Sequence, residues 1–113
     1  MPDDPQTAGP GWHDLGPAHQ LPPGEVIEAV AGDRIVAVAN VDGELLALDG
    51  ICAHQGGPLG KGRLEACTLT CPWHGWQYDV RTGRQQLSQT IRQASFAVQV
   101  RSDRIWVRLD PPA

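Results

Sequence analysis

Two pairs of cysteine and histidine residues stand close together in the middle of the 113-residue sequence. The first pair is Cys52 and His54, the second is Cys71 and His74, and sixteen residues separate His54 from Cys71. Thiolate sulfur and imidazole nitrogen both bind transition metals. The short spacing within each pair, with a Gly-rich connection between the pairs, predicts that the four side chains bind one metal centre.

A structural zinc site is one alternative for this set of four side chains. Zinc sites more often take two cysteines from one arm and two histidines from the other. Here each arm supplies one residue of each kind. Chance is a second alternative, because an isolated cysteine often serves as a small buried hydrophobic residue.

The pattern resembles the Rieske family, whose motif is Cys-x-His, about sixteen residues, and Cys-x-x-His. Cys52, His54, Cys71 and His74 fill all four positions. The resemblance implies one Rieske-type [2Fe–2S] cluster, with the cysteines on the ferric iron and the histidines on the iron that accepts the electron. Neutral imidazoles in place of two thiolates raise the reduction potential from roughly −400 mV to between about −150 and +300 mV.

The family also implies a shell of residues around the cluster, in which glycines let backbone N–H groups approach the sulfides. Respiratory-chain members have a disulfide where this chain has Gly57 and Trp73, and a serine donor where it has Trp76, but they share the tyrosine at Tyr78. Because this chain keeps the tyrosine donor and lacks the serine donor, we predict a reduction potential between about −150 and +50 mV. The predicted shell is Gln55, Gly56, Gly57, Trp73, Gly75, Trp76 and Tyr78.

Alternating apolar and polar residues predict strands on both sides of the metal-binding motif. A first strand is expected at residues 12–15 and a meander at 25–30, 34–41 and 44–48, with a hairpin turn at Asp42 and Gly43. A second hairpin is expected at 96–100 and 105–109, with Trp106 on the face opposite the apolar set. The resemblance implies the Rieske fold, an all-β antiparallel β-sandwich base with a small two-loop cluster-binding subdomain. A short turn within 87–92 is the one helical element allowed for.

Length and composition predict one loop-rich domain, since the 113 residues include 13 glycines and 10 prolines. We expect a flexible tail at residues 1–11, a single domain at 12–113, and the cluster-binding subdomain at about 50–80. The start shows no signal-peptide pattern, and the longest apolar run, 35–39, is too short for a membrane span. We therefore expect a cytoplasmic monomer that binds no membrane.

Three further residues carry chemistry outside the motif. Cys67 lies in an alternating stretch and is expected to be a packed strand residue, with a redox role as the weaker alternative. The histidines His13 and His19 are expected to be surface or strand residues, because nothing near them completes a site.

Charge is distributed unevenly along the chain, whose net charge is −4. Residues 1–60 carry nine acids and one base, and residues 61–113 carry eight bases and four acids. A strand fold interleaves the two halves, so we expect the asymmetry mostly to cancel. The alternative is an acidic and a basic face that orient a redox partner. The bases do not form the cluster that nucleic-acid binding requires.

The resemblance is to Rieske-type ferredoxins of bacterial ring-hydroxylating oxygenase systems, whose third loop often carries prolines where residues 86–93 have none. It implies an electron carrier without catalysis of its own, which a flavin-dependent reductase and a terminal oxygenase contact at the tip formed by His54 and His74. Alternatives are a small Rieske subunit of an enzyme like nitrite reductase, a zinc-stapled binding module, and a redox sensor that acts through Cys67.

Overall fold

The computed structural model describes residues 11–51, 57–73, 75–86 and 93–109, and these residues form antiparallel strands with two short 3₁₀ helices. None of the described helices is long and apolar enough to cross a membrane. The elements are β1 (Trp12–Pro17), η1 (Ala18–Gln20), β2 (Val26–Ala31), β3 (Arg34–Val41), β4 (Glu44–Asp49), η2 (Leu59–Lys61), β5 (Arg63–Glu65), β6 (Thr68–Thr70), β7 (Gln77–Asp79), β8 (Ser95–Arg101) and β9 (Arg104–Arg108).

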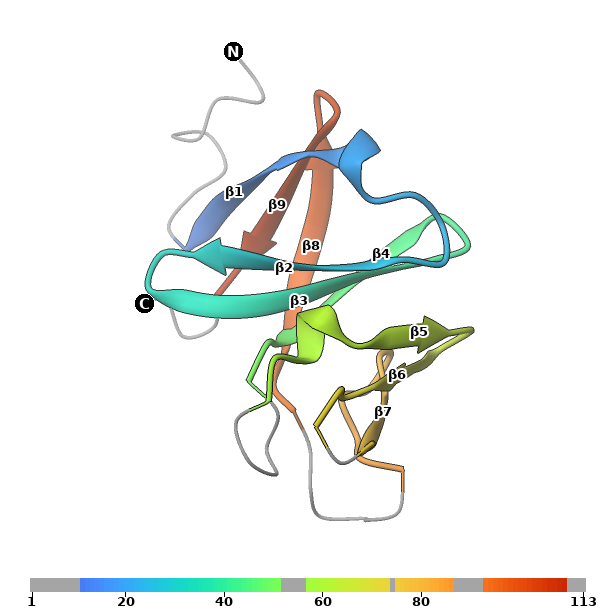
Figure 1. Ribbon diagram of the computed structural model, residues 1–113. Helices are drawn as coiled ribbons and strands as arrows, with labels where there is room; N and C mark the ends of the chain where they lie inside the picture. The colour runs from blue at the N-terminus through green and yellow to red at the C-terminus, as the bar shows by residue number, and fades with distance from the viewer. Residues whose placement is uncertain (1–10, 52–56, 74, 87–92, 110–113) are drawn as a thin grey trace.

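The larger sheet has six strands in the order β1-β9-β8-β4-β3-β2, and every neighbouring pair is antiparallel. Its edge strands β1 and β2 also contact each other, so the sheet curls back on itself (Figure 1). At this edge His13 lies against Gly32, where an added Cβ would be 3.1 Å from the imidazole Cε1. The predicted all-β class, the meander and the closing hairpin are confirmed.

Two hairpin turns set the register of the larger sheet. Asp42 and Gly43 have φ angles of +53° and +97°, and Ser102 and Asp103 have φ angles of +50° and +63°. Two consecutive residues with positive φ form the turn whose twist matches that of the flanking strands. Both turns lie where the sequence predicts them.

Strand β3 is buried on both faces and therefore belongs to two apolar cores. Val36 and Val38 pack into one core with residues of β8 and β9. Ala37 and Ala39 pack into the other, which includes Leu69 and Tyr78 of the smaller sheet. Because successive side chains of a strand point to opposite faces, a nearly continuous apolar sequence is what two-sided burial requires.

The smaller sheet has three strands in the order β5-β6-β7 and lies below the larger one in Figure 1. Helix η2 leads into it and lies against β2, where an added Cβ on Gly60 would be 2.7 Å from Glu28 Cα. At Gly62 an added Cβ would overlap the carbonyl oxygen of Thr70. Glycines therefore let the chain enter this sheet at close packing distance.

The expected strand position of Cys67 is wrong. Ala66 and Cys67 form the turn between β5 and β6, and Ala66 has a φ of +54°. The alternating pattern from Leu64 to Thr70 belongs to two short strands rather than one. The turn has no glycine, asparagine or aspartate, the residues that normally mark a positive φ.

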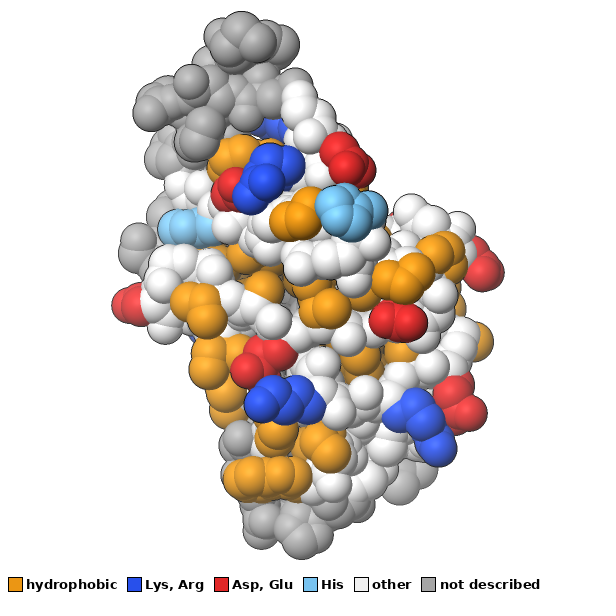
Figure 2. Space-filling view, turned by 45° about the horizontal axis from the view of Figure 1, so that its top comes forward, with side chains coloured by type: hydrophobic (Ala, Val, Ile, Leu, Met, Phe, Trp, Pro, Cys, Tyr) orange, Lys and Arg blue, Asp and Glu red, His pale blue; other side chains and the backbone are white. Residues whose placement is uncertain are grey.

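In the folded structure, acidic and basic residues remain unevenly distributed between the two sheets of the described residues. Residues 57–73 and 75–86 carry four bases and two acids, whereas residues 11–51 and 93–109 carry eight acids and four bases. Figure 2 shows both signs on one face of the molecule, so the separation is partial. The part of the chain around the smaller sheet is nonetheless net positive and the larger sheet net negative.

Asn40 stabilises the turn between β3 and β4. Its side chain is buried, the Nδ2 group donates to the carbonyl of Leu21 at 2.8 Å, and Oδ1 accepts from the N–H of Gly43 at 2.7 Å. We predict that Asn40→Ala lowers the free energy of unfolding by about 1–3 kcal/mol, since it leaves buried polar groups without partners. Chemical denaturation measures the loss.

The matched control for this prediction is Gln99→Ala on β8, where the side chain is exposed and, within the described part of the chain, accepts hydrogen bonds from Arg101 alone. That change should alter the unfolding free energy by at most about 0.5 kcal/mol. Equal losses at the two positions would show that burial of the Asn40 amide contributes nothing.

Candidate metal centre

Cys71 directly follows β6 and opens the second arm of the predicted metal centre. Its side chain is buried, its N–H donates to the carbonyl of Trp76 at 2.7 Å, and the N–H of Trp73 lies 3.4 Å from its Sγ. These contacts bring Trp73 and Trp76 close to Cys71. A backbone N–H directed at sulfur stabilises negative charge on a thiolate.

Cys71 is the one predicted ligand among the described residues. Cys52, His54 and His74 lie outside them, together with the shell residues Gln55 and Gly56. Consequently no group of three potential metal ligands is gathered within the described part of the chain. The four-ligand set stays a prediction.

The residues on either side of the first Cys-His pair are held together by backbone contacts. Ile51 and Pro58 form an isolated antiparallel bridge, and the N–H of Leu59 donates to the carbonyl of Gly50 at 2.9 Å. Gly50 itself lies against β3, where an added Cβ would be 2.8 Å from Ile35 Cγ2. The first arm therefore leaves and rejoins the larger sheet at one point.

The two arms meet at Gly57. An added Cβ there would lie 2.8 Å from Cys71 Sγ and 2.9 Å from Trp73 Cγ. No side chain fits at that distance without displacing the sulfur or the indole. Gly57 and Trp73 occupy the positions of the disulfide in respiratory-chain Rieske proteins, and here the two arms are joined by packing instead.

We predict that Gly57→Ala prevents normal metal loading, because the added methyl group occupies the space beside Cys71 Sγ. Overpacking of this kind costs about 1–3 kcal/mol, and here it acts directly on a ligand atom. Iron per chain and visible absorbance of freshly purified protein measure the effect, and both should fall well below the wild-type values.

Gly24→Ala is the control, because an added Cβ at Gly24 meets nothing within 4 Å, although the φ of +88° there, unlike the backbone at Gly57, disfavours alanine. It should lower stability modestly and leave the iron content unchanged. Full loading of Gly57→Ala would show that the contact with Cys71 does not constrain the centre.

Gln93 is a residue of the site that the sequence does not reveal. Its side chain is 3% exposed, and its Nε2 group donates to the carbonyls of Asp49 at 2.8 Å and Ile51 at 2.7 Å. Its own N–H donates to the carbonyl of Gly83 at 2.7 Å. Gln93 thus ties the chain immediately before Cys52 to the turn after β7 and to the start of β8.

We predict that Gln93→Leu loosens the first arm, because it removes both hydrogen bonds that the buried Gln93 amide donates to the carbonyls of Asp49 and Ile51, at a cost of about 1–3 kcal/mol. On slow heating, visible absorbance should be lost at a lower temperature than in wild type and before the circular dichroism of the strands. Gln86→Leu removes an exposed hydrogen bond to Thr68 Oγ1 and serves as control. Simultaneous loss of both signals in Gln93→Leu would mean that Gln93 supports only the global fold.

The other predicted shell residues differ in their exposure. Tyr78 is fully buried in β7, and Trp76 packs half-buried against the same core as Cys71. Trp73 is 49% exposed. Gly75 has a φ of +74°, and an added Cβ there would meet open space. Donation by the Tyr78 hydroxyl to a cluster cysteine stays a prediction.

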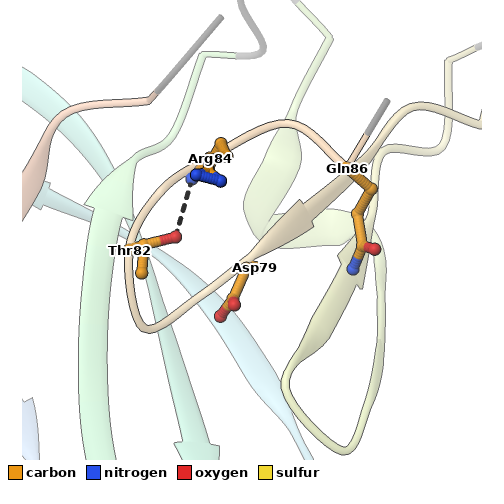
Figure 3. Close-up of a pocket in the computed structure, with 4 residues that line it drawn as sticks. All are labelled: Asp79, Thr82, Arg84 and Gln86. Atoms are coloured by element: carbon orange, nitrogen blue, oxygen red, sulfur yellow. Dashed lines mark hydrogen bonds between the residues drawn. The ribbon is translucent and has the colours of Figure 1, made fainter. Parts of the chain in front are cut away.

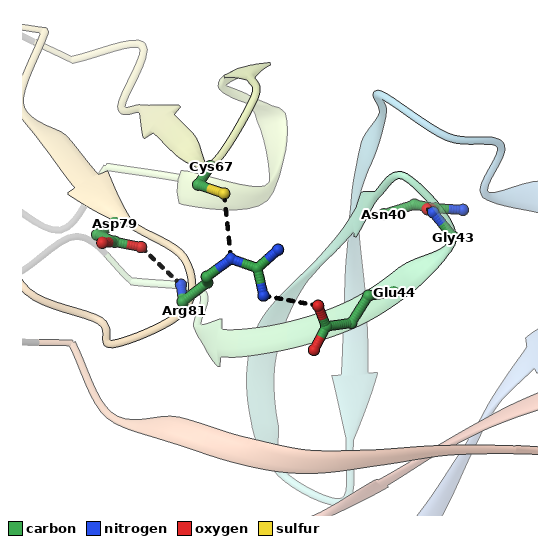
Figure 4. A network of polar contacts seen from close by, with 6 residues as sticks. All are labelled: Asn40, Gly43, Glu44, Cys67, Asp79 and Arg81. Carbon is green, nitrogen blue, oxygen red and sulfur yellow. Dashed lines mark hydrogen bonds and ion pairs between the residues drawn. The ribbon is translucent and has the colours of Figure 1, made fainter.

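Cys67 takes part in a polar network that joins the smaller sheet to the larger one (Figure 4). Arg81 Nε lies 3.2 Å from Cys67 Sγ, and Arg81 Nη1 lies 2.6 Å from the carboxylate of Glu44 on β4. The hydrogen bond to Glu44, and then that to Cys67, raise the already high pKa of Arg81. The guanidinium therefore stays charged, but the network is exposed and screened by solvent.

A small hollow beside β7 shares Asp79 with this network, since Asp79 Oδ1 accepts from the N–H of Arg81 at 2.9 Å (Figure 3). It is lined by Asp79, Thr82, Arg84 and Gln86, and the N–H of Arg84 donates to Thr82 Oγ1 at 3.2 Å. Its polar side chains come from the end of β7 and from the residues that follow it. The histidines outside the motif lie on the larger sheet side: His13 in β1, and His19 exposed in η1, 3.5 Å from Asp103.

A family model of the Rieske [2Fe-2S] domain matches residues 11–100. The chain therefore belongs to the Rieske family, its fold is the Rieske fold, and its cofactor is a Rieske-type [2Fe–2S] cluster. The described part of the site fits this group: Cys71 is buried beside a backbone donor, and the glycine contact at its sulfur leaves no room for a competing side chain.

Comparison with known proteins gives two kinds of relative. The chain is 29% identical over 101 residues to the ferredoxin component of the naphthalene 1,2-dioxygenase system of Pseudomonas aeruginosa, covering 87% of this chain and 95% of that protein. It is 38% identical over 69 residues to the oxygenase component of 3-ketosteroid-9-alpha-monooxygenase of Mycolicibacterium smegmatis, covering 60% of this chain and 18% of that protein. The chain thus spans under a fifth of the oxygenase component.

A solved structure of the complex of reduced oxygenase and oxidised ferredoxin in carbazole 1,9a-dioxygenase contains a similar chain. The TM-score is 0.79 at 26% identity, with 88% of this chain and 94% of that chain covered. The fold of the described residues is therefore similar to that of this solved chain.

Proposed function

We propose that this protein is a one-electron carrier that passes electrons from a flavin-dependent reductase to a terminal oxygenase. The observation that carries the proposal is coverage: this chain matches 95% of a protein named as a ferredoxin component, and only 18% of an oxygenase component. A Rieske cluster supplies a one-electron couple, with a potential between about −150 and +300 mV across the family.

The chain's own residues hold the cofactor and set its surroundings. We propose Cys52, His54, Cys71 and His74 as the four ligands. The N–H of Trp73 stabilises negative charge on Cys71 Sγ, which favours the reduced state.

Burial of the residues beside Cys71 keeps water from the sulfur. Leu69 and Tyr78 are fully buried in the same apolar core as Cys71 and exclude water from that side. A low local polarity strengthens the hydrogen bond to the sulfur.

The proposed partners follow from proteins that resemble this chain. A related ferredoxin has been captured with an oxygenase in the carbazole dioxygenase structure. We propose that an oxygenase contacts this chain at the tip carrying His54 and His74, and that the carrier acts as a cytoplasmic monomer.

A second function remains a candidate because the match to oxygenase components has the higher identity over its shorter length. In that alternative the Rieske domain relays electrons inside a larger assembly, as in the nitrite reductase type of enzyme. Stable co-purification with a large catalytic chain distinguishes such a relay from a free carrier.

The carrier role predicts stoichiometric and reversible electron exchange. Protein reduced with dithionite and freed of excess reductant should reduce cytochrome c with one electron per chain, and it should repeat this after renewed reduction. A potentiometric titration should give a one-electron midpoint between about −150 and +50 mV. A midpoint above +200 mV would contradict the predicted potential, and failure to deliver an electron would contradict the carrier function.

A further inference from the structure

An open hollow on the surface lies directly beside Cys71. Its lining includes Lys61 and Arg63 from the entry to the smaller sheet, and Thr70 and Pro72 from the chain around Cys71. The lining contributes two positive charges and, among the described residues, no carboxylate. A partner that approaches Cys71 from this side therefore meets a cationic surface.

The two cations differ in how far they are neutralised. Arg63 lies 3.4 Å from Glu65 in an ion pair whose side chains are both mostly exposed, so solvent screens much of their attraction. Lys61 ends η2 and is exposed, and no carboxylate of the described residues lies within ion-pair distance of it. The positive charge beside Cys71 is thus available to a partner.

The wider charge distribution strengthens this local effect. The residues around the smaller sheet carry four bases against two acids, and the described residues of the larger sheet carry eight acids against four bases. Such a separation turns an incoming charged partner toward one end of the molecule. An acidic partner is drawn to the end with Cys71 and repelled by the other.

Apolar surface lies next to the two cations. Pro72 is exposed and lines the hollow together with them, and the next residue, Trp73, is 49% exposed. Figure 2 shows apolar side chains at the lower end of a face that also carries Lys and Arg side chains. Protein interfaces commonly combine an aromatic or apolar centre with a charged rim that sets orientation. Lys61, Arg63, Pro72 and Trp73 together have this composition, and we call them the cationic face.

We propose that the cationic face docks a carboxylate-rich surface of the oxygenase that accepts the electron. The proposal rests on the proposed function and adds the sign of the charge on the partner. The net charge of −4 alone predicts the opposite, repulsion of acidic partners. Docking here would place the acceptor against Pro72 and Gly75, which flank the proposed ligand His74 in sequence, and so at the tip proposed above.

Small redox ions test the sign of the charge at the site of electron exit. In the first reaction one electron passes from the reduced protein to ferricyanide, giving ferrocyanide, with no bond or proton transferred. Stopped-flow absorbance should show a rate constant that falls as salt is added, because screening weakens attraction. With the cationic oxidant tris(phenanthroline)cobalt(III), the rate constant should rise with salt.

Reversing the charge of Lys61 and Arg63 tests whether these two residues cause the salt dependence of the ferricyanide rate constant. Lys61→Glu combined with Arg63→Glu should lower the low-salt ferricyanide rate constant by roughly tenfold and reverse its salt dependence. The control Arg108→Glu, combined with Arg104→Glu, makes the same change of net charge on β9 of the larger sheet. That control should change the rate much less, and circular dichroism should show both variants folded.

Binding of a labelled oligoglutamate, followed by fluorescence anisotropy, tests the partner chemistry without any electron transfer. Wild-type protein should bind it, the Lys61 and Arg63 double variant should not, and the β9 control should. A ferricyanide rate that rises with salt, or equal effects of the two double variants, would overturn the inference. If the protein binds oligoglutamate but cannot be reduced, the carrier function is rejected, whereas binding of carboxylates by the cationic face is still supported.

Discussion

The contact between Gly57 and Cys71 Sγ is the constraint on which the rest of the site depends. Gly57 belongs to the first arm, and Cys71 and Trp73 belong to the second. An added Cβ on Gly57 would lie 2.8 Å from Cys71 Sγ and 2.9 Å from Trp73 Cγ, so the two arms are packed too closely for a side chain at Gly57. In respiratory-chain relatives a disulfide joins these positions, which fixes the arms covalently. Here the join consists of packing and backbone hydrogen bonds, so its strength depends on the sheets that support each arm.

That support comes from β3, whose two faces belong to different cores. One face packs with β8 and β9, and the other packs against the smaller sheet that carries Cys71. Gln93 adds a polar connection, since it binds the carbonyls just before the first arm and the turn that follows β7. The site is therefore positioned by a shared core and by one buried amide, with the exposed Arg81 network as a weaker connection.

The sequence predicts much of this arrangement because its strongest signals are local. Alternation and the turn at Asp42 and Gly43 identify the meander. The spacing of the two Cys-His pairs predicts the metal centre, and its four-ligand set stays a prediction. Cys67 is misplaced because the turn at Ala66 lacks the usual turn residues. Gln93 is missed because its partners are backbone carbonyls 42 and 44 residues away, and no local pattern encodes such a contact. The separation of charge likewise depends on which strands enter which sheet.

The central claim is that two mixed arms hold a Rieske [2Fe–2S] cluster in this chain. Visible absorption and low-temperature EPR of aerobically purified protein, before and after dithionite, test it most directly. The account predicts a red-brown protein without an EPR signal when oxidised. On reduction it should give a rhombic signal whose average g value lies below that of the free electron. A colourless protein that contains one zinc per chain would contradict the account and leave a zinc-stapled binding domain.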